Sequence, residues 1–584
     1  MFKELAYKPG WLFALTLIFG LSLAAYSNSF HAGFQLDDGH QISDNPSIRD
    51  ISNAPRFFTD AALSADPYIP RRIYRPVTLI AFTLCYAVFG LDVFGYHLLN
   101  FVLHVVVSSL VFIVIRKVCE AGSADKTWLP LIAALVFALH PIQTGTVTYI
   151  SSCSVLLASL FFLLSFYAFL RYRNGPDSGR AVWAALAPVL YMTGLFSKEM
   201  AVSLPVVMLV YDFIFTFPKM ASLRGRLRAA RFYLPFMAAL LLFLVFKKSF
   251  QGSLGDDRAT YSVYTYFISE TKVLLMYVRL LFLPVNQNEV YNLPITRSVD
   301  LLVAVSLMLV AASLVFLYRI RRINPVAAFF GSWFFIVIAP ESSLVPIMDI
   351  AFEHRLYLPS VGFIAALAML ASQVKFGSAK LKKAVALSII ALLPILTFNR
   401  NHVWATTNTM WDDVSRKNTG PDWAYYFEDI FVAHWNMGEY YLSIGEKERA
   451  IEQFKLVTGG KPPYTVPAYE RLGDIYYGLE RYREAAETFK AEADITPDDA
   501  SVLYNLAVSE MHAGDLDAAE TDMERALKFS SDDYGVRYNL ALIYYKKGRH
   551  SEAVRHARAA ARLSPGDSER AEAELLVAQL EGGG

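Results

Sequence analysis

The sequence predicts an all-α polytopic membrane protein with about eleven transmembrane helices, followed by an α-solenoid of helical repeats. Three observations carry this prediction. The 584 residues are 55% hydrophobic and 18% charged, whereas soluble domains contain about 25% charged residues. Apolar runs separated by short polar loops fill residues 1–398, and charged residues become dense from residue 399 onward. In this second part, small and aromatic residues recur with a period near 34 residues.

Composition excludes several classes of function. Lys and Arg total 54 against 53 for Asp and Glu, so there is no basic field to hold nucleic acid by its phosphates. The three cysteines, Cys85, Cys119 and Cys153, are too scattered for a disulfide framework or a zinc site. An ordinary soluble enzyme, a nucleic-acid-binding protein and a thiol-based redox or metal protein are therefore excluded.

A membrane-crossing helix needs about 20 mostly apolar residues. The first candidate, 10–26, follows Lys3 and Lys8; it is long and lacks a clear cleavage site, so we interpret it as a retained anchor rather than a signal peptide. Two further apolar runs, 76–89 and 263–283, are predicted to lie along or dip into the outer interface. The other ten spans are 95–115, 128–144, 150–170, 181–196, 201–217, 232–246, 301–317, 326–339, 356–371 and 384–396.

The distribution of basic residues predicts which loops face the cytoplasm, because Lys and Arg collect on that side of membrane proteins. With eleven spans, every loop on one side is basic. The amino terminus is then cytoplasmic and the carboxy-terminal region lies outside. The basic residues are Arg116, Lys117, Lys126, Arg171, Arg173, Arg180, Lys219, Arg224, Arg226, Arg228, Arg231, Arg319, Arg321, Arg322, Lys375, Lys380, Lys382 and Lys383.

The carboxy-terminal part has the pattern of tetratricopeptide repeats: four over residues 431–567, after a linker at 399–430 and before a capping helix and tail at 568–584. Small residues let paired helices touch, and prolines end the second helix of a pair. Such an array holds a peptide or protein on its concave side, or docks against its own membrane domain or a partner subunit. The small residues are Gly438, Gly473, Ala507, Ala541, Ala450, Ala485, Ala519 and Ala553; the prolines are Pro462, Pro497 and Pro565, with Ser531 in place of a fourth.

The chemistry is expected where ionisable side chains meet the outer face, since charges within an apolar domain are costly unless pairing or function keeps them there. The first outer loop, 27–75, carries Asp37 and Asp38. Two adjacent carboxylates can supply a general base for an acceptor hydroxyl or two metal ligands. The other interpretation is a helix cap or an exposed loop acid.

Further polar residues belong to the same predicted face. Arg75 could bind a phosphate, and Arg355 beside Glu353 suits a lipid-linked phosphate or simply extends towards the interface. Lys198 and Glu199 form either an internal ion pair or part of a site, while His140 is interpreted as a helix-ending histidine. His97, His104, His354 and Tyr357 complete the set.

Six short motifs, taken in order and spacing with the repeats, extend over nearly the whole chain. They are Leu36-Asp37-Asp38 with Asn45-Pro46, Tyr74 to Thr78, Gly95 to Asn100 with His104, Ala138 to Thr144, Phe196 to Glu199, and Arg355 to Gly362. In these motifs the chain resembles the transmembrane and tetratricopeptide-repeat O-mannosyltransferases of animals and their bacterial relatives, members of the GT-C class of glycosyltransferases. Gly145 stands where that family often has an acid, and His354 stands at a position that is often acidic.

The resemblance implies an enzyme that moves a mannose-like or other hexose from a polyprenyl-phosphate carrier to Ser or Thr hydroxyls of acceptor proteins at the non-cytoplasmic face. It places the catalytic acid at Asp37 or Asp38, with Asp37 favoured. Donor binding falls to Arg75, Lys198, Arg355 and Tyr357, supported by His97, His104, His140, Glu199, Glu353 and His354.

In the expected mechanism Asp37 takes the hydroxyl proton, the sugar configuration inverts, and Arg355, Arg75 and Lys198 stabilise the leaving phosphate. No cofactor or metal is required; if a divalent ion took part, Glu199 and Glu353 are the further oxygen donors available. The rival functions are a non-catalytic envelope scaffold and a transporter of the lipid-linked sugar, which would need polar residues at mid-membrane. A bacterial cytoplasmic membrane, with the repeats on its outer side, is the expected location.

Overall fold

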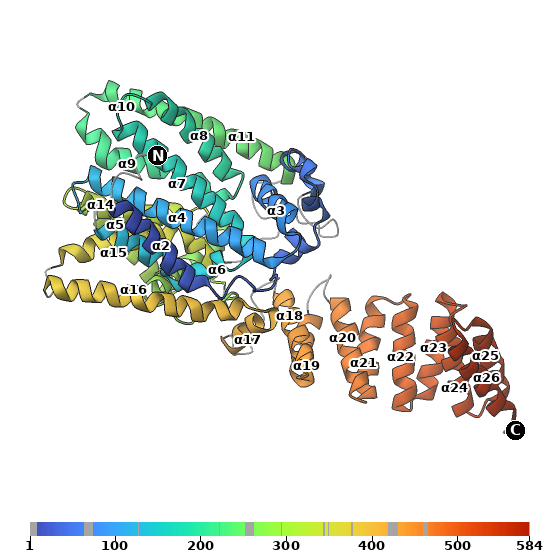
Figure 1. Ribbon diagram of the computed structural model, residues 1–584. Coiled ribbons are helices and arrows are strands. Elements are labelled where there is room, and N and C mark those ends of the chain that lie inside the picture. The colour runs from blue at the N-terminus through green and yellow to red at the C-terminus, as the bar shows by residue number, and fades with distance from the viewer. Residues whose placement is uncertain are drawn as a thin grey trace. The chain divides into compact units, whose positions relative to one another are not determined.

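The computed structural model describes residues 9–63, 74–125, 128–220, 222–251, 262–291, 293, 295–342, 345–347, 350–374, 378–417, 430–459 and 465–582. The described residues form helices and no strand, which confirms the all-α prediction. The chain divides into two compact units, Met1–Tyr426 and Phe427–Gly584 (Figure 1). Of the residues used for prediction, Lys3, Lys8, Lys126, Lys375 and Pro462 lie outside the described ranges, as do residues 418–429 of the expected linker.

The first unit is a bundle of long apolar helices in which α4 and α7 pack against each other and bury much of their surface (Figure 1). Short 3₁₀ and π-helical turns join these helices where they change direction. The helices are α2 (Pro9–Tyr26), α3 (Pro76–Phe89), α4 (Val93–Ala121), α5 (Trp128–Leu139), α6 (Thr144–Val147), α7 (Cys153–Asn174), α8 (Arg180–Leu195), α9 (Leu204–Tyr211), α10 (Leu223–Ala230), α11 (Leu234–Gln251), α12 (Val263–Phe282), α13 (Leu301–Ile320), α14 (Pro325–Ile338), α15 (Tyr357–Gln373), α16 (Ala379–Asn401) and α17 (Thr407–Lys417).

Every predicted span coincides with an apolar helix. Within the described ranges, seven helical segments are long and apolar enough to cross a membrane, and the pair Trp128–Leu139 and Pro141–Val147, bent by 51°, is an eighth. The remaining three predicted spans fall on shorter apolar helices, Gly10–Tyr26, Arg180–Leu195 and Pro325–Ile338. The first unit therefore has the helices of an integral membrane protein, while the total of eleven crossings stays a prediction.

The first unit continues beyond residue 398, where the sequence suggested a linker. Helix α16 ends at Asn401, and Arg400 forms an ion pair with Asp413 of α17 at 2.6 Å. Trp404 and Trp411 are buried. The dense charges of this segment therefore belong to an amphipathic helix whose apolar side packs on the bundle, and charge density alone cannot distinguish such a helix from a linker.

In the second unit, the described residues form four antiparallel helix pairs and a final helix. Glycines allow the helices of the first two pairs to approach closely. A Cβ atom on Gly438 would lie 2.7 Å from the Phe454 ring, and one on Gly473 would lie 2.5 Å from the Phe489 ring. The pairs are α18 (Ile430–Ser443) with α19 (Lys447–Thr458), α20 (Thr465–Gly478) with α21 (Tyr482–Ile495), α22 (Ala500–Ala513) with α23 (Leu516–Phe529), and α24 (Tyr534–Lys546) with α25 (His550–Leu563); α26 (Asp567–Gly582) follows.

We expect replacing Glu492 with Gln to stabilise the repeats at pH 8 and to have little effect at pH 5. Glu492 of α21 is 3% exposed, and its burial, followed by the charges of Glu470, Asp499 and Asp474, raises its pKa to about 7. Ionisation of Glu492 therefore destabilises the folded repeats. The loss of stability begins in the ordinary glutamate pKa range and grows as pH rises to about 7.

The measurement is amide hydrogen exchange in α20–α22 of the full chain, with variant and parent compared at each pH. We expect several-fold slower exchange in Glu492→Gln at pH 8. The exposed Glu487 on the same helix provides the control, and Glu487→Gln should leave exchange unchanged. Equal slowing at both pH values in Glu492→Gln would show that ionisation is not the cause.

Candidate active site

The first loop makes a tight turn at the two aspartates. Leu36 has φ of 48°, in the left-handed region that a side chain other than glycine or asparagine seldom adopts. The Asp38 carboxylate oxygen Oδ2 accepts a hydrogen bond from the Gln35 backbone N–H at 2.9 Å and so closes this turn. Such a conformation costs about 1–3 kcal/mol and persists only where surrounding contacts hold it. Asp38 is one of those contacts.

Asp38 is buried and joins this loop to the start of α7. Its Oδ1 accepts hydrogen bonds from the Ser151 backbone N–H at 2.8 Å and from the Ser151 hydroxyl at 2.5 Å. The side chain is 1% exposed, and burial raises its pKa to about 7, against the effect of the Ser151 and Gln35 hydrogen bonds. With three donors directed at it, Asp38 holds the backbone rather than facing a substrate.

Asp37 differs from its neighbour in being accessible. Its side chain is 36% exposed, with Oδ1 lying 3.4 Å from His40 Nε2 and Oδ2 lying 3.4 Å from Gln41 Nε2. Its backbone N–H donates to the Tyr149 hydroxyl at 3.1 Å. A general base must first be able to reach the proton it removes. Of the two acids that the sequence left open, the geometry therefore favours Asp37.

Tyr149, which supports Asp37, is itself held by two other elements. Asn100 of α4 donates to the backbone carbonyls of Tyr149 at 3.2 Å and of Ile150 at 3.3 Å. The Tyr149 ring stacks on Trp404 with 5.6 Å between ring centroids. The aspartate loop thus rests on side chains contributed by α4 and by the segment that follows α16.

A second cluster contains the predicted cations, each close to a carboxylate. Lys198 Nζ lies 2.9 Å from Glu341 Oε1, so Lys198 pairs with Glu341 and not with its neighbour Glu199. Glu199 instead lies 3.0 Å from Lys247 Nζ and 3.6 Å from an Arg75 Nη. Lys198 and Glu199 therefore form ion pairs with residues that are distant in the chain, and not with each other.

Arg355 and Glu353, which lie close together in the sequence, contact different partners. Arg355 lies 3.8 Å from Glu270 of α12 and donates to the Ile350 carbonyl at 2.7 Å. Glu353 points elsewhere, because residues two apart in a helical turn do not face each other. It accepts hydrogen bonds from the Gln287 side chain at 2.8 Å, the Asn288 backbone N–H at 2.8 Å and the Tyr291 hydroxyl at 2.5 Å.

His354 shows that these cations gather in one place. Its ring stacks on Phe352 with 5.0 Å between centroids, and the charges of Lys198, Arg355 and Arg75 all act on it. Arg75 is the most accessible of the three, with a side chain that is 23% exposed, and its Nε makes no hydrogen bond to any described residue. Arg75 is therefore the cation best placed to meet an anion.

Gly145 connects the two clusters. A Cβ atom there would lie 3.7 Å from Glu353 Cβ and 3.8 Å from the Trp404 ring, which in turn stacks on Tyr149 beneath Asp37. The acid and the cations therefore occupy the same end of the helices. A larger acidic side chain at Gly145 would have to compete with Glu353 and Trp404 for this space.

The remaining candidates contribute to packing. Tyr357, expected at the donor, is buried, and its hydroxyl lies 2.8 Å from His104 Nδ1. Because His104 Nε2 must donate to the Ala138 carbonyl at 3.0 Å, Nδ1 accepts the Tyr357 proton. His97 Nε2 lies 2.9 Å from the Ala32 carbonyl, and His140 Nδ1 accepts from the Ile142 N–H at 3.2 Å. Tyr357 thus joins helices, in contrast to the predicted donor contact.

Sequence reasoning missed the partners of these residues. Ser151, Tyr149, Glu341 and Lys247 carried no recognisable motif, and Glu270 was considered only as a sign of an interfacial helix. Each belongs to a segment far along the chain from the residue that it contacts. Among the described residues, no group of three or more His, Cys, Asp or Glu side chains is arranged to hold a metal ion.

Comparison with known proteins supports both parts of the predicted resemblance. Family models described as tetratricopeptide repeat match residues 470–534 and 510–580. Human protein O-mannosyl-transferase TMTC3 is 26% identical over 554 residues, which cover 84% of this chain and 58% of the relative. Protein O-mannosyl-transferase tmtc2 of Xenopus laevis is 32% identical over 206 residues, 34% of this chain and 24% of the relative.

The chain thus spans 58% of the length of its relative TMTC3, and the similarity covers the membrane unit as well as the repeats. Among solved structures, one titled as the crystal structure of MamA protein matches with a TM-score of 0.25 and 21% identity, over 26% of this chain and 84% of that chain.

Replacing Asp38 with Asn should destabilise the first loop. An amide offers one acceptor oxygen and places an NH₂ group opposite backbone N–H donors, and a buried donor left without an acceptor costs about 1–3 kcal/mol. We expect a lower apparent Tm of the full chain in detergent and faster proteolysis in the first loop. Asp44→Asn, an exposed acid of the same loop, is the control and should behave like the parent. Unchanged unfolding and proteolysis in Asp38→Asn would contradict the anchoring role.

Proposed function

We propose that this chain is a membrane-embedded protein O-glycosyltransferase that transfers a mannose-like or other hexose to Ser or Thr hydroxyls of acceptor proteins. The observation that carries the proposal is an accessible carboxylate, Asp37, held by its buried neighbour Asp38 at the end of the helices where the cations gather. The similarity to proteins named O-mannosyl-transferase supports the same reaction class.

The cation cluster suits a donor with a phosphate, and we propose a polyprenyl-phosphate sugar. Among the described residues, the cations Arg75, Lys198, Lys247 and Arg355 lie beside the carboxylates Glu199, Glu341 and Glu270. Lys198 and Arg355 are buried and engaged, whereas Arg75 is partly exposed. Arg75 would contact the phosphate, and the buried cations would set the local potential.

In the proposed reaction Asp37 accepts the proton of the acceptor hydroxyl while that oxygen forms a bond to the anomeric carbon. The bond from that carbon to the carrier phosphate oxygen breaks on the opposite face, so the configuration inverts. The phosphate leaves as an anion and needs no proton, because the cation cluster stabilises its charge. The proposal uses no metal ion, and the two carboxylates considered as extra ligands are engaged elsewhere: Glu199 by Lys247 and Arg75, and Glu353 by the 287–291 segment.

The repeat unit would present the acceptor. Tetratricopeptide arrays hold extended segments of other proteins on their concave side. For this to work, the repeats and Asp37 must share one aqueous compartment, which is the topology expected from the basic loops. We propose the non-cytoplasmic side of a bacterial cytoplasmic membrane.

Replacing Asp37 with Asn should abolish transfer without unfolding the protein. Loss of a general base lowers the rate by about 10²–10⁴-fold. The assay follows sugar transfer from polyprenyl-phosphate mannose to a Ser- and Thr-containing acceptor by the reconstituted full chain, with apparent Tm measured in parallel. Asp44→Asn should retain activity. Transfer at the parental rate in Asp37→Asn would refute the assignment and favour a non-catalytic scaffold.

Replacing Arg75 with Ala should mainly raise the KM for the lipid-linked donor, by about tenfold or more, because a charge-assisted hydrogen bond contributes about 1.5–3 kcal/mol. Arg75→Lys should restore part of the effect, since it keeps the charge and loses the planar fork. Arg56→Ala, an exposed arginine of the first loop, is the control. A change confined to the KM of the acceptor would place Arg75 outside the donor site.

A further inference from the structure

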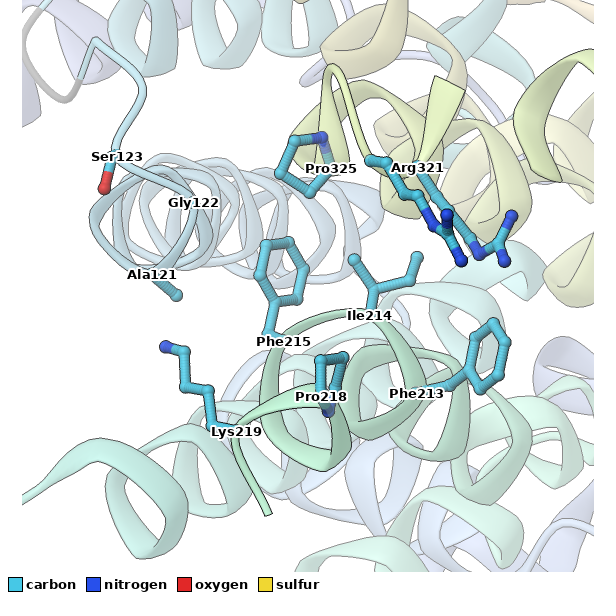
Figure 2. A pocket seen from close by; sticks show the side chains of 11 residues that line it. Ala121, Gly122, Ser123, Phe213, Ile214, Phe215, Pro218, Lys219, Arg321 and Pro325 are labelled. Atoms are coloured by element: carbon cyan, nitrogen blue, oxygen red, sulfur yellow. The ribbon is translucent and has the colours of Figure 1, made fainter. Parts of the chain in front are cut away.

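A cavity of about 600 Å³ opens at the opposite end of α4 from the candidate active site. It lies between the end of α4, the segment that follows α9, and the turn from α13 to α14 (Figure 2). Asn100, near the start of α4, holds the aspartate loop, whereas Ala121 at its end borders the cavity. At 1.5 Å per residue these positions are about 30 Å apart along the helix, so the cavity is separate from the aspartate site.

Among the described residues that line this cavity, three are basic and none is acidic. The basic residues are Lys219, Arg321 and Arg322. Lys219 and Arg322 form no hydrogen bond or ion pair with any residue in the described part of the chain. Arg321 donates to the Tyr318 carbonyl and lies over the Tyr318 ring at 3.6 Å. The cavity therefore gathers about three positive charges at neutral pH.

Three basic residues elsewhere on the same predicted side each lie beside a carboxylate, whereas the side chains that line the cavity include no carboxylate. Lys117 lies 2.9 Å from Glu120, Arg173 lies 2.5 Å from Asp212, and Arg180 lies 3.0 Å from Asp177. The helix ends of α4 and α13 attract cations through their dipoles, but that effect is worth only about 0.3–1 kcal/mol at an exposed site. The helix dipoles therefore do not explain why three basic side chains surround one cavity.

The walls between the cations are apolar. Figure 2 shows Phe215 and Ile214 between Lys219 and Arg321, with Pro218 and Phe213 along the same edge. Phe213 is exposed although it is a large aromatic residue. A ligand that fits both features carries an anionic group for the cations and an apolar body for the aromatic and proline side chains.

We propose that this cavity binds the phosphate headgroup of an anionic membrane lipid, at a site distinct from that of the sugar donor. Arginine binds phosphate oxygens through two parallel N–H groups and lysine binds them as a point charge. Basic pockets between membrane helices on the cytoplasmic side are suited to such headgroups, and the cavity lies among the loops that the basic-residue pattern assigns to that side.

The test uses the purified full chain in detergent, with lipid binding followed by native mass spectrometry and by the rise in apparent Tm. We expect phosphatidylglycerol to bind and stabilise the parent, and phosphatidylcholine with the same acyl chains to do so at least tenfold more weakly. The double variant Lys219→Ala/Arg322→Ala should lose this preference. Both side chains are exposed, so the variant should fold, as its apparent Tm without lipid will show.

The matched control is Arg319→Ala/Lys383→Ala, which removes two exposed basic residues of the same predicted side that do not line the cavity. This control should keep the parental preference. Equal loss in both double variants, or no loss in Lys219→Ala/Arg322→Ala, would overturn the proposal. Full competition by inorganic phosphate at the same concentration as the lipid would also overturn it, because it would show a site for a soluble phosphate rather than a headgroup.

Discussion

The candidate site depends on one buried carboxylate. Asp38 receives three hydrogen bonds, from Gln35 and from the N–H and hydroxyl of Ser151, and so ties the first loop to the start of α7. This attachment helps to hold Leu36 at its positive φ and so to fix the backbone from which Asp37 projects. A buried acid thus positions an accessible one, which explains why two adjacent aspartates have different environments.

The buried side chains of the cation cluster are also held by contacts with residues that are distant in the chain. Buried charges are costly unless paired, and the buried Lys198 and Arg355 are paired with Glu341 and Glu270, which are distant from them in the chain. The pairs fix the directions of the side chains in advance, so in the proposed reaction the electrostatic environment of the leaving phosphate would need no rearrangement. Arg75 is less buried than Lys198 and Arg355, and for this reason the proposed function assigns the direct phosphate contact to it.

Much of the architecture could be predicted because its signals are local. Runs of apolar residues locate the helices, and the recurrence of Gly438, Gly473, Ala507 and Ala541 locates the repeats, since each close helix contact needs a small residue at that position. The segment after residue 398 shows the limit of this approach. Its charges suggested a linker, whereas Trp404 and Trp411 bury themselves against the bundle.

The sequence by itself determined the helical class, the positions of the apolar helices and repeats, and the short set of ionisable residues from which a site can be built. Only the tertiary structure decided which of these residues are accessible and which partners they have. In it, Asp37 is accessible whereas Asp38 is buried, and Arg355 lies beside Glu270 rather than Glu353. The Tyr357 hydroxyl forms a hydrogen bond with His104. The physical reason is that periodicity and hydropathy act between neighbours in the chain, whereas burial and ion pairing depend on segments that meet only after folding.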